Sequence, residues 1–495
     1  MTLKVLFAAA EALPFSKTGG LADVAQALPA AIAALGADVR LVTPAYRGAR
    51  DRLAEGVLRC ELAVRGQRFA LWEGRGSHPN LRVWLLDHAP LFAREGGPYT
   101  DASGRDHPDN AWRFGCFCEA VARLALEEGG QAWFPDVVHL NDWHTGLAAV
   151  WLARSPARPR TVFTIHNLAY QGRFGRNEYE ALGLPAELWH PGALELYGGF
   201  SFLKAGLVFS DALTTVSPTY AREIRSPEFG EGMDGVIRSR AHVLQGITNG
   251  IDLEAWDPAT DPFLVQCYDL ESLAEGKRAN KRAVQEAFGL DVADGRPLVG
   301  AIGRLAHQKG TDLLLHADPW LDHNGAQLAL LGTGDPALEH ALREWAQRRP
   351  RQVAVHIGYE ERLAHLIEAG ADLFLMPSRY EPCGLNQMYS QRYGTVPVVR
   401  RTGGLVDTVR DATCQALATG SATGVIFDRA DASGIAYGLR RAFILMKQPE
   451  IWRAMQRAGM RSDFSWTRAA CSYLALYEGL VEGASMLRGG DGPAN

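Results

Sequence analysis

Residues 371–409 have the sequence ADLFLMPSRYEPCGLNQMYSQRYGTVPVVRRTGGLVDTV, and this stretch decides the fold. Its first part, 371–376, is mostly apolar and predicts a buried strand. Pro377 and Pro382 prevent a helix from forming before Gly384. The sequence therefore predicts a strand, an irregular loop and then a helix, which is the repeating unit of an α/β sheet.

One carboxylate, Glu381, stands in that loop, beyond the carboxyl end of the strand. Ligands of open α/β sheets bind in the crevice at this edge. Gly384 and the pair Gly403–Gly404 precede two helix starts, whose backbone N–H groups carry partial positive charge and suit a diphosphate. The layout predicts a nucleotide-sugar site.

The first half of the chain repeats the same pattern. Residues 4–10 form a short apolar run, followed by a glycine-bearing loop, an Ala/Leu-rich helix over about 20–35 and a second strand at 38–43. Further strands are predicted at 83–86, 137–140, 162–165 and 212–216, alternating with helical stretches. This alternation predicts a doubly wound parallel sheet.

The pattern loosens over 252–294, where prolines and a charged stretch occur, and it then restarts. Strands are predicted at 298–302, 327–331, 353–356, 372–376, 396–399 and 425–427. The second half is therefore also predicted to be Rossmann-like, and 495 residues suit two large domains.

Composition excludes several classes of protein. Hydrophobic residues make up 47% and charged residues 22%, and no stretch approaches the roughly 20 apolar residues that span a bilayer. A net charge of −5 gives no reason to expect a nucleic-acid partner. The seven cysteines form no C-x-x-C pair, and the chain starts directly in a strand, so we expect a reducing cytoplasm without an export signal. No feature predicts an oligomeric state.

Four motifs occur in one order: KTGGLADV at 17–24, HNLAYQG at 166–172, GRL with QKG at 303–310, and the block around Glu381. With them the chain resembles the bacterial glycogen synthases and plant starch synthases. The resemblance implies a retaining glucosyltransferase of α/β class, with two facing Rossmann-like domains of the GT-B type and the active site in the interdomain cleft.

The resemblance and the patterns together predict the domain boundaries. We expect an acceptor-side domain at 1–255, a linker or hinge at 256–294, a nucleotide-sugar-binding domain at 295–466, a helix crossing back at 467–484 and a flexible tail at 485–495.

Two cations, Arg304 and Lys309, follow the predicted strand 298–302 and are expected to bind the diphosphate. The alternative is that they are solvated loop residues. No D-x-D triplet occurs, although metal-dependent sugar transferases usually hold their metal with such carboxylates. We therefore expect no metal and no cofactor, with Arg, Lys and helix N-termini taking the metal's place.

In the loop after the first strand, Gly19 and Gly20 permit close approach of a ligand to the backbone, and Lys17 can reach an anionic group. The alternative is a tight strand-to-helix connection with an exposed lysine. Asp23 either contacts the nucleotide or only favours the positive helix end.

His166 ends the strand 162–165, and its motif implies that it binds the transferred sugar, although a lone histidine is more often buried and satisfied. Asp142 is expected to orient the acceptor hydroxyl or His166, or else to cap the following helix. The family usually has a histidine where this chain has Asn141.

Glu381 is the central carboxylate, with a structural loop acid as the alternative. The wider superfamily has a second Glu eight positions on, but here that residue is Tyr389. Since one carboxylate cannot run a two-carboxylate double displacement, we expect a front-face route in which the departing phosphate takes the acceptor's proton. Three further residues complete the predicted site: Asn249 as a donor contact or turn residue, Tyr359 stacked on the base, and Cys383 lining the pocket.

The predicted function is elongation of an α-1,4-glucan such as glycogen from ADP-glucose, with retention. The ADP preference comes from the resemblance alone. A different retaining nucleotide-sugar transferase, a non-catalytic glucan-binding protein and a phosphorylase remain as alternatives; the last would need pyridoxal phosphate and a longer chain.

Overall fold

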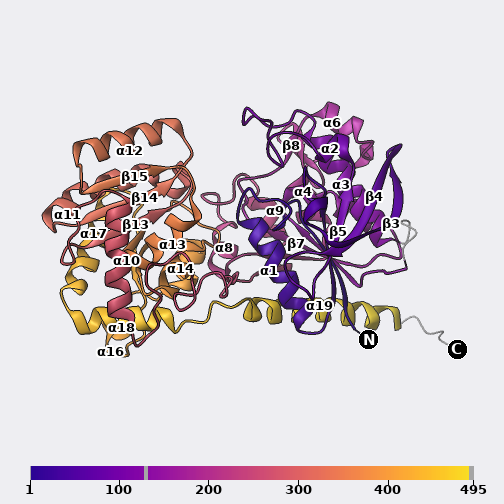
Figure 1. Cartoon of the computed structure of the whole chain (residues 1–495). Helices are drawn as coiled ribbons and strands as arrows, with labels where there is room; N and C mark the ends of the chain where they lie inside the picture. Colours follow the sequence, from indigo (N-terminus) through magenta and orange to yellow (C-terminus); the bar gives the residue numbers. More distant parts are fainter. Residues whose placement is uncertain (1, 127–131, 490–495) are drawn as a thin grey trace. The chain divides into compact units, whose positions relative to one another are not determined.

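The computed structural model describes residues 2–126 and 132–489, which divide into two compact α/β units (Figure 1). Of the described residues, 2–126, 132–216, 221–250 and 466–489 belong to the first unit, and 217–220 and 251–465 belong to the second. The first unit is thus built from both ends of the chain.

The strands of the first unit are β1 (Lys4–Ala8), β2 (Asp38–Pro44), β3 (Ala54–Val64), β4 (Gln67–Arg75), β5 (Arg82–Asp87), β6 (Val137–Asn141), β7 (Arg160–Ile165), β8 (Arg173–Phe174), β9 (Glu195–Leu196), β10 (Gly199–Ser201), β11 (Ala212–Thr215) and β12 (Leu244–Gly246). Among the described residues they form a nine-stranded sheet, in the order β12-β11-β7-β6-β1-β2-β5-β4-β3, and a small antiparallel sheet β8-β10-β9. From β12 to β5 the strands are parallel. This is the doubly wound order, whose direction of winding reverses between β1 and β6.

The helices of this unit are α1 (Gly20–Ala34), α2 (Ala89–Phe92), α3 (Asn110–Ala125), α4 (Trp143–Gly146), α5 (Ala148–Ala153), α6 (Arg176–Ala181), α7 (Phe202–Phe209), α9 (Asp234–Ser239) and α19 (Trp466–Gly489), while α8 (Pro218–Glu223) is shared with the second unit. Helix α19 packs against α1, and its Trp466, Tyr473 and Tyr477 join the core of the first unit. The predicted tail from 485 is helical through Gly489, and the rest of that prediction, 490–495, lies outside the described residues.

The second unit has the strands β13 (Leu298–Ile302), β14 (Gln327–Gly332), β15 (Val353–Ile357), β16 (Leu373–Met376), β17 (Val396–Arg400) and β18 (Val425–Phe427). They form a parallel sheet in the order β15-β14-β13-β16-β17-β18. This is the Rossmann order, and its winding reverses between β13 and β16. The helices that cover it are α10 (Leu273–Ala287), α11 (Asp318–His323), α12 (Pro336–Arg348), α13 (Glu361–Gly370), α14 (Asn386–Arg392), α15 (Gly403–Thr408), α16 (Cys414–Ala418), α17 (Ala432–Met446) and α18 (Pro449–Met460).

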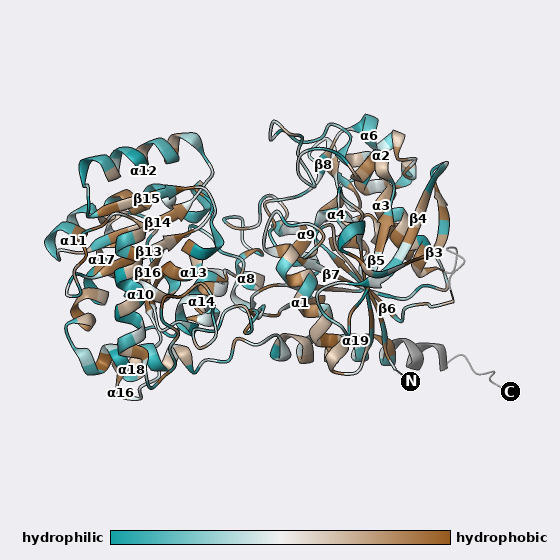
Figure 2. Cartoon of the chain, viewed as in Figure 1, coloured by the Kyte–Doolittle hydropathy of each residue, from teal (hydrophilic) through white to brown (hydrophobic). Residues whose placement is uncertain are grey.

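Strand β16 shows why the strands of this sheet are apolar throughout. Leu373 and Leu375 join one hydrophobic cluster, whereas Phe374 and Met376 join another. Alternate side chains of a strand point to opposite faces, so both faces of the sheet are buried. Figure 2 shows brown in the strands of this sheet, whereas the outer helix α12 is largely teal.

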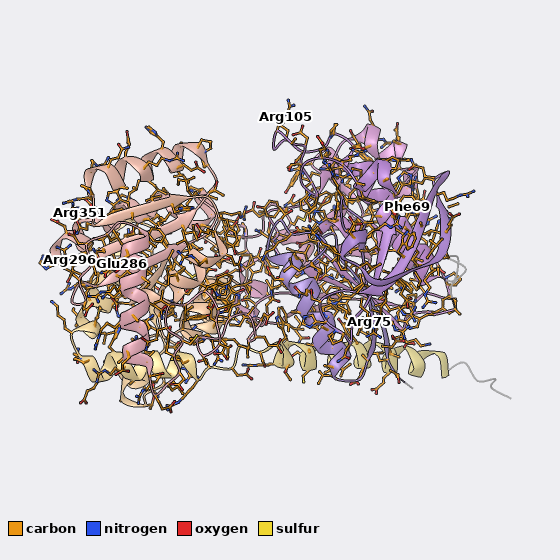
Figure 3. All side chains as sticks on the ribbon, in the orientation of Figure 1. Phe69, Arg75, Arg105, Glu286, Arg296 and Arg351 are labelled. Carbon is orange, nitrogen blue, oxygen red and sulfur yellow. The ribbon has the colours of Figure 1, made fainter. Side chains whose placement is uncertain are left out.

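The predicted linker 256–294 is not a separate connection. The long continuous part of the second unit begins at Ile251, and α10 lies within it, packed against α13. Figure 3 labels Arg296 and Arg351, which pair with Asp291 at 3.0 and 3.9 Å near the amino ends of β13 and β15. This is the edge of the sheet opposite the one expected to bind ligand.

No helix of the described chain is long and apolar enough to cross a membrane.

Candidate active site

In the second unit, the two predicted key residues lie at the point where the winding reverses. Lys309 follows β13 and Glu381 follows β16, and the Lys309 Nζ lies 2.8 Å from Oε1 and 2.6 Å from Oε2 of Glu381. The Glu381 side chain is 4% exposed and that of Lys309 is 28% exposed. A buried carboxylate is therefore paired with a cation that keeps access to solvent.

The two loops that carry this pair are bonded to each other. The Arg379 amide donates to the Gln308 carbonyl at 2.8 Å, and the Ser378 hydroxyl donates to Glu381 Oε2 at 3.1 Å. Gly310 has φ +64°, and a Cβ there would lie 2.2 Å from the Pro377 carbonyl oxygen. Glycine lets the loops approach this closely. Arg304 is exposed on the same loop as Lys309, so both cations lie at the carboxyl edge of the sheet.

Close contacts with the backbone of the Glu381 loop require glycine at positions 403 and 404. A Cβ on Gly403, which has φ +43°, would lie 1.9 Å from the Glu381 carbonyl oxygen, and one on Gly404 would lie 2.1 Å from that of Cys383. The Gly404 amide donates to the Glu381 carbonyl at 3.1 Å, so this N–H at the start of α15 is used internally. Gly384, with φ +71°, forms the turn into α14.

The remaining predicted residues of this unit lie as follows. Tyr359 follows β15 and is 64% exposed, with its hydroxyl donating to Glu361. Cys383 is buried beside Glu381. Tyr389 stacks on Trp256 at 3.8 Å between ring centroids, so the place of a second carboxylate is filled by a stacked aromatic ring.

In the first unit, Asp142 and His166 follow the neighbouring strands β6 and β7 and are in contact. Asp142 Oδ1 accepts a hydrogen bond from the His166 amide at 2.8 Å, and its side chain does not cap the helix that follows. The His166 ring is oriented by Asn141, whose Oδ1 lies 2.9 Å from Nε2. Since the Asn141 amide nitrogen donates to the Ala8 carbonyl, its oxygen is the acceptor and the His166 Nε2 carries the proton.

Burial shifts the pKa values of both His166 and Asp142. It lowers the pKa of His166 to about 3, so the ring is neutral near pH 7. It raises the pKa of Asp142 to about 7, against the hydrogen bonds from the His166 and Asn167 amides. Asp142 also has φ +57°, a strained backbone conformation for a residue other than glycine, and such strain is common at functional sites.

The loop after β1 contains Lys17, whose Nζ pairs with Asp23 Oδ1 at 2.9 Å. A Cβ on Gly19 or Gly20 would meet no atom within 4 Å, and neither residue has a positive φ. No contact among the described residues therefore requires glycine at these two positions, and open space above the backbone is what a ligand approaching closely needs.

Sequence reasoning missed Glu11 and the role of Asn141. Glu11 is buried and accepts hydrogen bonds from the Gly19 amide at 3.1 Å and the Tyr99 hydroxyl at 2.6 Å, with a further one from the Thr18 amide. Burial raises its pKa. Its signal was a lone acid directly after the first apolar strand. Asn249 is buried and lies just before the chain passes from the first unit into the second.

Within residues 2–126 and 132–489, no group of three or more His, Cys, Asp or Glu side chains is arranged to hold a metal ion.

Two doubly wound units, each with polar side chains where its winding reverses, match the architecture of the GT-B glycosyltransferases. Residues 4–239 match the family model described as starch synthase catalytic domain, and residues 285–458 match that of glycosyl transferases group 1. Sucrose-phosphate synthase from Thermosynechococcus elongatus shares the fold, with a TM-score of 0.58 at 18% identity over 97% of this chain and 100% of its own.

Proteins with higher sequence identity show which family of glycosyltransferases the chain belongs to. The chain is 50% identical over 483 residues to a glycogen synthase of Thioalkalivibrio sulfidiphilus, covering 97% of this chain and 100% of the relative. The catalytic domain of starch synthase IV from Arabidopsis thaliana, bound to ADP and acarbose, matches with a TM-score of 0.87 and 34% identity over 97% and 100% of the two chains. The chain belongs to the glycogen and starch synthase family of glycosyltransferases.

Proposed function

We propose that this enzyme transfers glucose from ADP-glucose to the non-reducing end of an α-1,4-glucan such as glycogen, with retention of configuration. The observation that carries the proposal is the Lys309–Glu381 pair at the winding reversal of the second unit. The glycogen synthase relatives and the ADP held by the similar starch synthase support the choice of acceptor and donor.

The donor side of the reaction uses two cations. Arg304 and Lys309 would balance the charge that develops on the diphosphate as the bond between it and the glucose C1 breaks. A new bond forms on the same face between C1 and the acceptor 4-hydroxyl oxygen, and the hydroxyl proton passes to the departing phosphate. Glu381 holds the sugar hydroxyls or the developing positive charge. Tyr389 supplies no second carboxylate, which favours this route over a double displacement.

The sugar side uses His166 and Asp142. A neutral His166 with its proton on Nε2, held by Asn141, leaves Nδ1 as an acceptor for a sugar hydroxyl. Asp142 fixes the backbone of His166 and so keeps the ring in place. Lys17 and the open surface of Gly19 and Gly20 are assigned to the nucleotide.

In this proposal no metal ion is required, because Arg304 and Lys309 take the role that a cation has elsewhere. We also propose the reducing cytoplasm as its compartment, since all seven cysteines, each within the described ranges, are free thiols. Treatment of the purified enzyme with a chelator should leave turnover unchanged. Complete loss of activity that returns with a divalent ion would refute the metal-free account.

The test of function is release of nucleotide from ADP-glucose and from UDP-glucose, each with and without glycogen. We expect glycogen-dependent release from ADP-glucose, with glucose recovered in α-1,4 linkage. Glu381→Gln and Lys309→Ala should each lower kcat by about 100-fold or more in folded protein. Wild-type rates from either variant, or transfer only to a small acceptor, would contradict the proposal.

A further inference from the structure

The segment 251–261, with which the chain enters the second unit, is fastened by an aromatic stack. The Trp256 ring stacks on His365 of α13 at 3.8 Å and 10°, and on Tyr389 of α14 at 3.8 Å and 13°. Two rings that are both parallel to a third at this distance must lie on its opposite faces, since on one face they would overlap. Trp256 is therefore inserted between α13 and α14.

A second residue of the same segment bridges the same two helices. Asp261 Oδ2 lies 2.7 Å from His365 Nδ1 and accepts a hydrogen bond from the Tyr393 hydroxyl, at the end of α14, at 2.5 Å. The Asp261 side chain is fully buried. Trp256 and Asp261, which we call the entry clamp, thus each join α13 to α14.

A positive charge on His365 strengthens its contacts with Asp261 and Trp256. Burial works to lower the pKa of His365, but its hydrogen bonds to Asp261 and Glu361 and their negative charges outweigh burial and raise the pKa to about 9. The titratable groups near it besides Asp261 are Glu361, with Oε1 3.4 Å from Nε2, and Glu368, whose pKa burial raises to about 8, so that Glu368 is mostly neutral near pH 7. His365 is therefore a cation near pH 7, and a cation over the face of an indole is attracted to it.

Helix α14 in turn holds the loop that contains Glu381. The Asn386 side chain donates to the carbonyl of Ile302, the last residue of β13, at 2.8 Å. The Gln387 side chain donates to the Cys383 and Gly384 carbonyls at 3.1 and 2.9 Å. Because these bonds start from the first turn of α14, a displacement of the helix displaces the turn from Glu381 to Gly384.

We propose that Trp256 and Asp261 are positioning residues for the transfer reaction, because they fix α14 and through it the place of Glu381 relative to Lys309. The inference rests on the proposed function for the reaction that it serves. Neither residue needs to touch the substrate. The site is consequently sensitive to the segment through which the chain arrives from the first unit.

The test compares Trp256→Leu with Trp256→Phe, and uses Trp320→Leu as the matched control. Trp320 is also a partly buried tryptophan of the second unit, but it packs on the cluster at the other face of the sheet. Steady-state kinetics, urea denaturation, ADP binding by calorimetry and hydrogen exchange of residues 381–392 are measured for each folded variant.

We expect Trp256→Leu to lower kcat by about tenfold to 100-fold, as small misplacements of reacting groups do, with a smaller change in KM for the donor. Exchange over 381–392 should accelerate. Trp256→Phe, which restores a stacking ring, should recover kcat to within about threefold of wild type, and Trp320→Leu should match wild type in both readouts. Unchanged kcat and exchange in Trp256→Leu, equal damage in both Trp256 variants, or equal damage in Trp320→Leu would overturn the proposal.

Asp261→Asn is the second variant and decides the matter if Trp256→Leu does not fold. It should lower kcat, accelerate exchange over 381–392, and bring the NMR titration of His365 down toward 6.5 from its raised value. A shifted titration with unchanged kcat and exchange would refute a positioning role. If wild-type enzyme binds ADP but transfers no glucose to glycogen, the proposed function fails, while exchange and ADP binding still report on the entry clamp.

Discussion

At the scale of single residues, glycines serve two different purposes in this protein. Gly403 and Gly404 lie where a side chain would collide with the backbone of the Glu381 turn, so the fold itself requires them. Gly19 and Gly20 have open space around the missing Cβ. The sequence presents all four as similar Gly-Gly pairs, and only the structure separates packing from ligand access.

Gly20→Ala tests whether the glycines of the first loop serve ligand access. Alanine restricts the unfolded chain and favours the helix that starts here, so the free energy of unfolding should rise by about 0.4–1 kcal/mol. Turnover should nevertheless fall by about tenfold, because the methyl group would displace the nucleotide from the backbone. Urea denaturation and steady-state kinetics measure the two effects. Unchanged turnover would remove this loop from the site.

Gly403→Ala is the opposite case. A positive φ and a contact of 1.9 Å with a carbonyl oxygen predict a loss of about 1–3 kcal/mol in the free energy of unfolding, together with a loss of activity. The same denaturation experiment measures it. A Gly403→Ala protein as stable as wild type would show that the Glu381 turn moves aside easily.

Sequence patterns placed four site residues correctly beyond strand ends, because Asp142 and His166 directly follow apolar runs, and Lys309 and Glu381 lie in the loops after two others. Patterns could not show which of these residues would meet. Pairing depends on the strand order: β13 lies beside β16, and β6 beside β7 and β1. Asn141 acquires its partners, Ala8 and His166, only from that order, which explains why sequence reasoning overlooked it. Glu11 was overlooked for another reason, since it bonds to amides of its own loop and to Tyr99, and no strand pattern marks either contact.

At the scale of elements, a buried chain of hydrogen bonds links α19 to the sheet of the first unit. The Tyr477 hydroxyl lies 2.6 Å from His139 Nδ1, and His139 Nε2 lies 2.6 Å from the Thr164 hydroxyl. His139 and Thr164 each precede a site residue by a few positions on β6 and β7. The chain therefore fixes α19 to the two strands that end in Asp142 and His166.

Tyr477→Phe tests that link, since it removes one hydroxyl and leaves the ring. The unpaired His139 nitrogen should lower the free energy of unfolding by about 1–3 kcal/mol. Tyr437→Phe, at a side chain that is 54% exposed, is the control and should change it by less than about 0.5 kcal/mol. Equal values for the two variants in urea denaturation would speak against a structural role for the bond.

Elements with apolar runs were predicted well, and elements without them were not. The hairpin β3–β4 escaped prediction because β3 is an edge strand that is exposed over most of its length, so its sequence carries no apolar run. The stretch 256–294 looked like a linker because it is polar and contains prolines. Its fixed position comes from Trp256, Asp261 and α10, whose partners lie about 100 residues further along the chain.

At the scale of the whole molecule, the entry clamp predicts a pH dependence of stability. The pKa of His365 is raised from 6.5 to about 9 on folding, so its protonated form stabilises the fold fully below pH 6.5, and this contribution is lost as pH rises through about 9. The difference in unfolding free energy between wild type and Asp261→Asn should therefore shrink between pH 7 and 10. A constant or growing difference in urea denaturation would contradict the charged pair.

The first unit takes its core from residues at both ends of the chain, whereas the second unit is nearly continuous from 251 to 465. On the ribosome, the middle of the protein can consequently finish folding while the beginning still lacks α19. Until Trp466, Tyr473 and Tyr477 emerge, the apolar surface of α1 that they cover stays exposed in the nascent chain. A chain that ends before Trp466 should therefore leave this surface of α1 uncovered, and we expect limited proteolysis to cleave such a truncated chain faster than the full one.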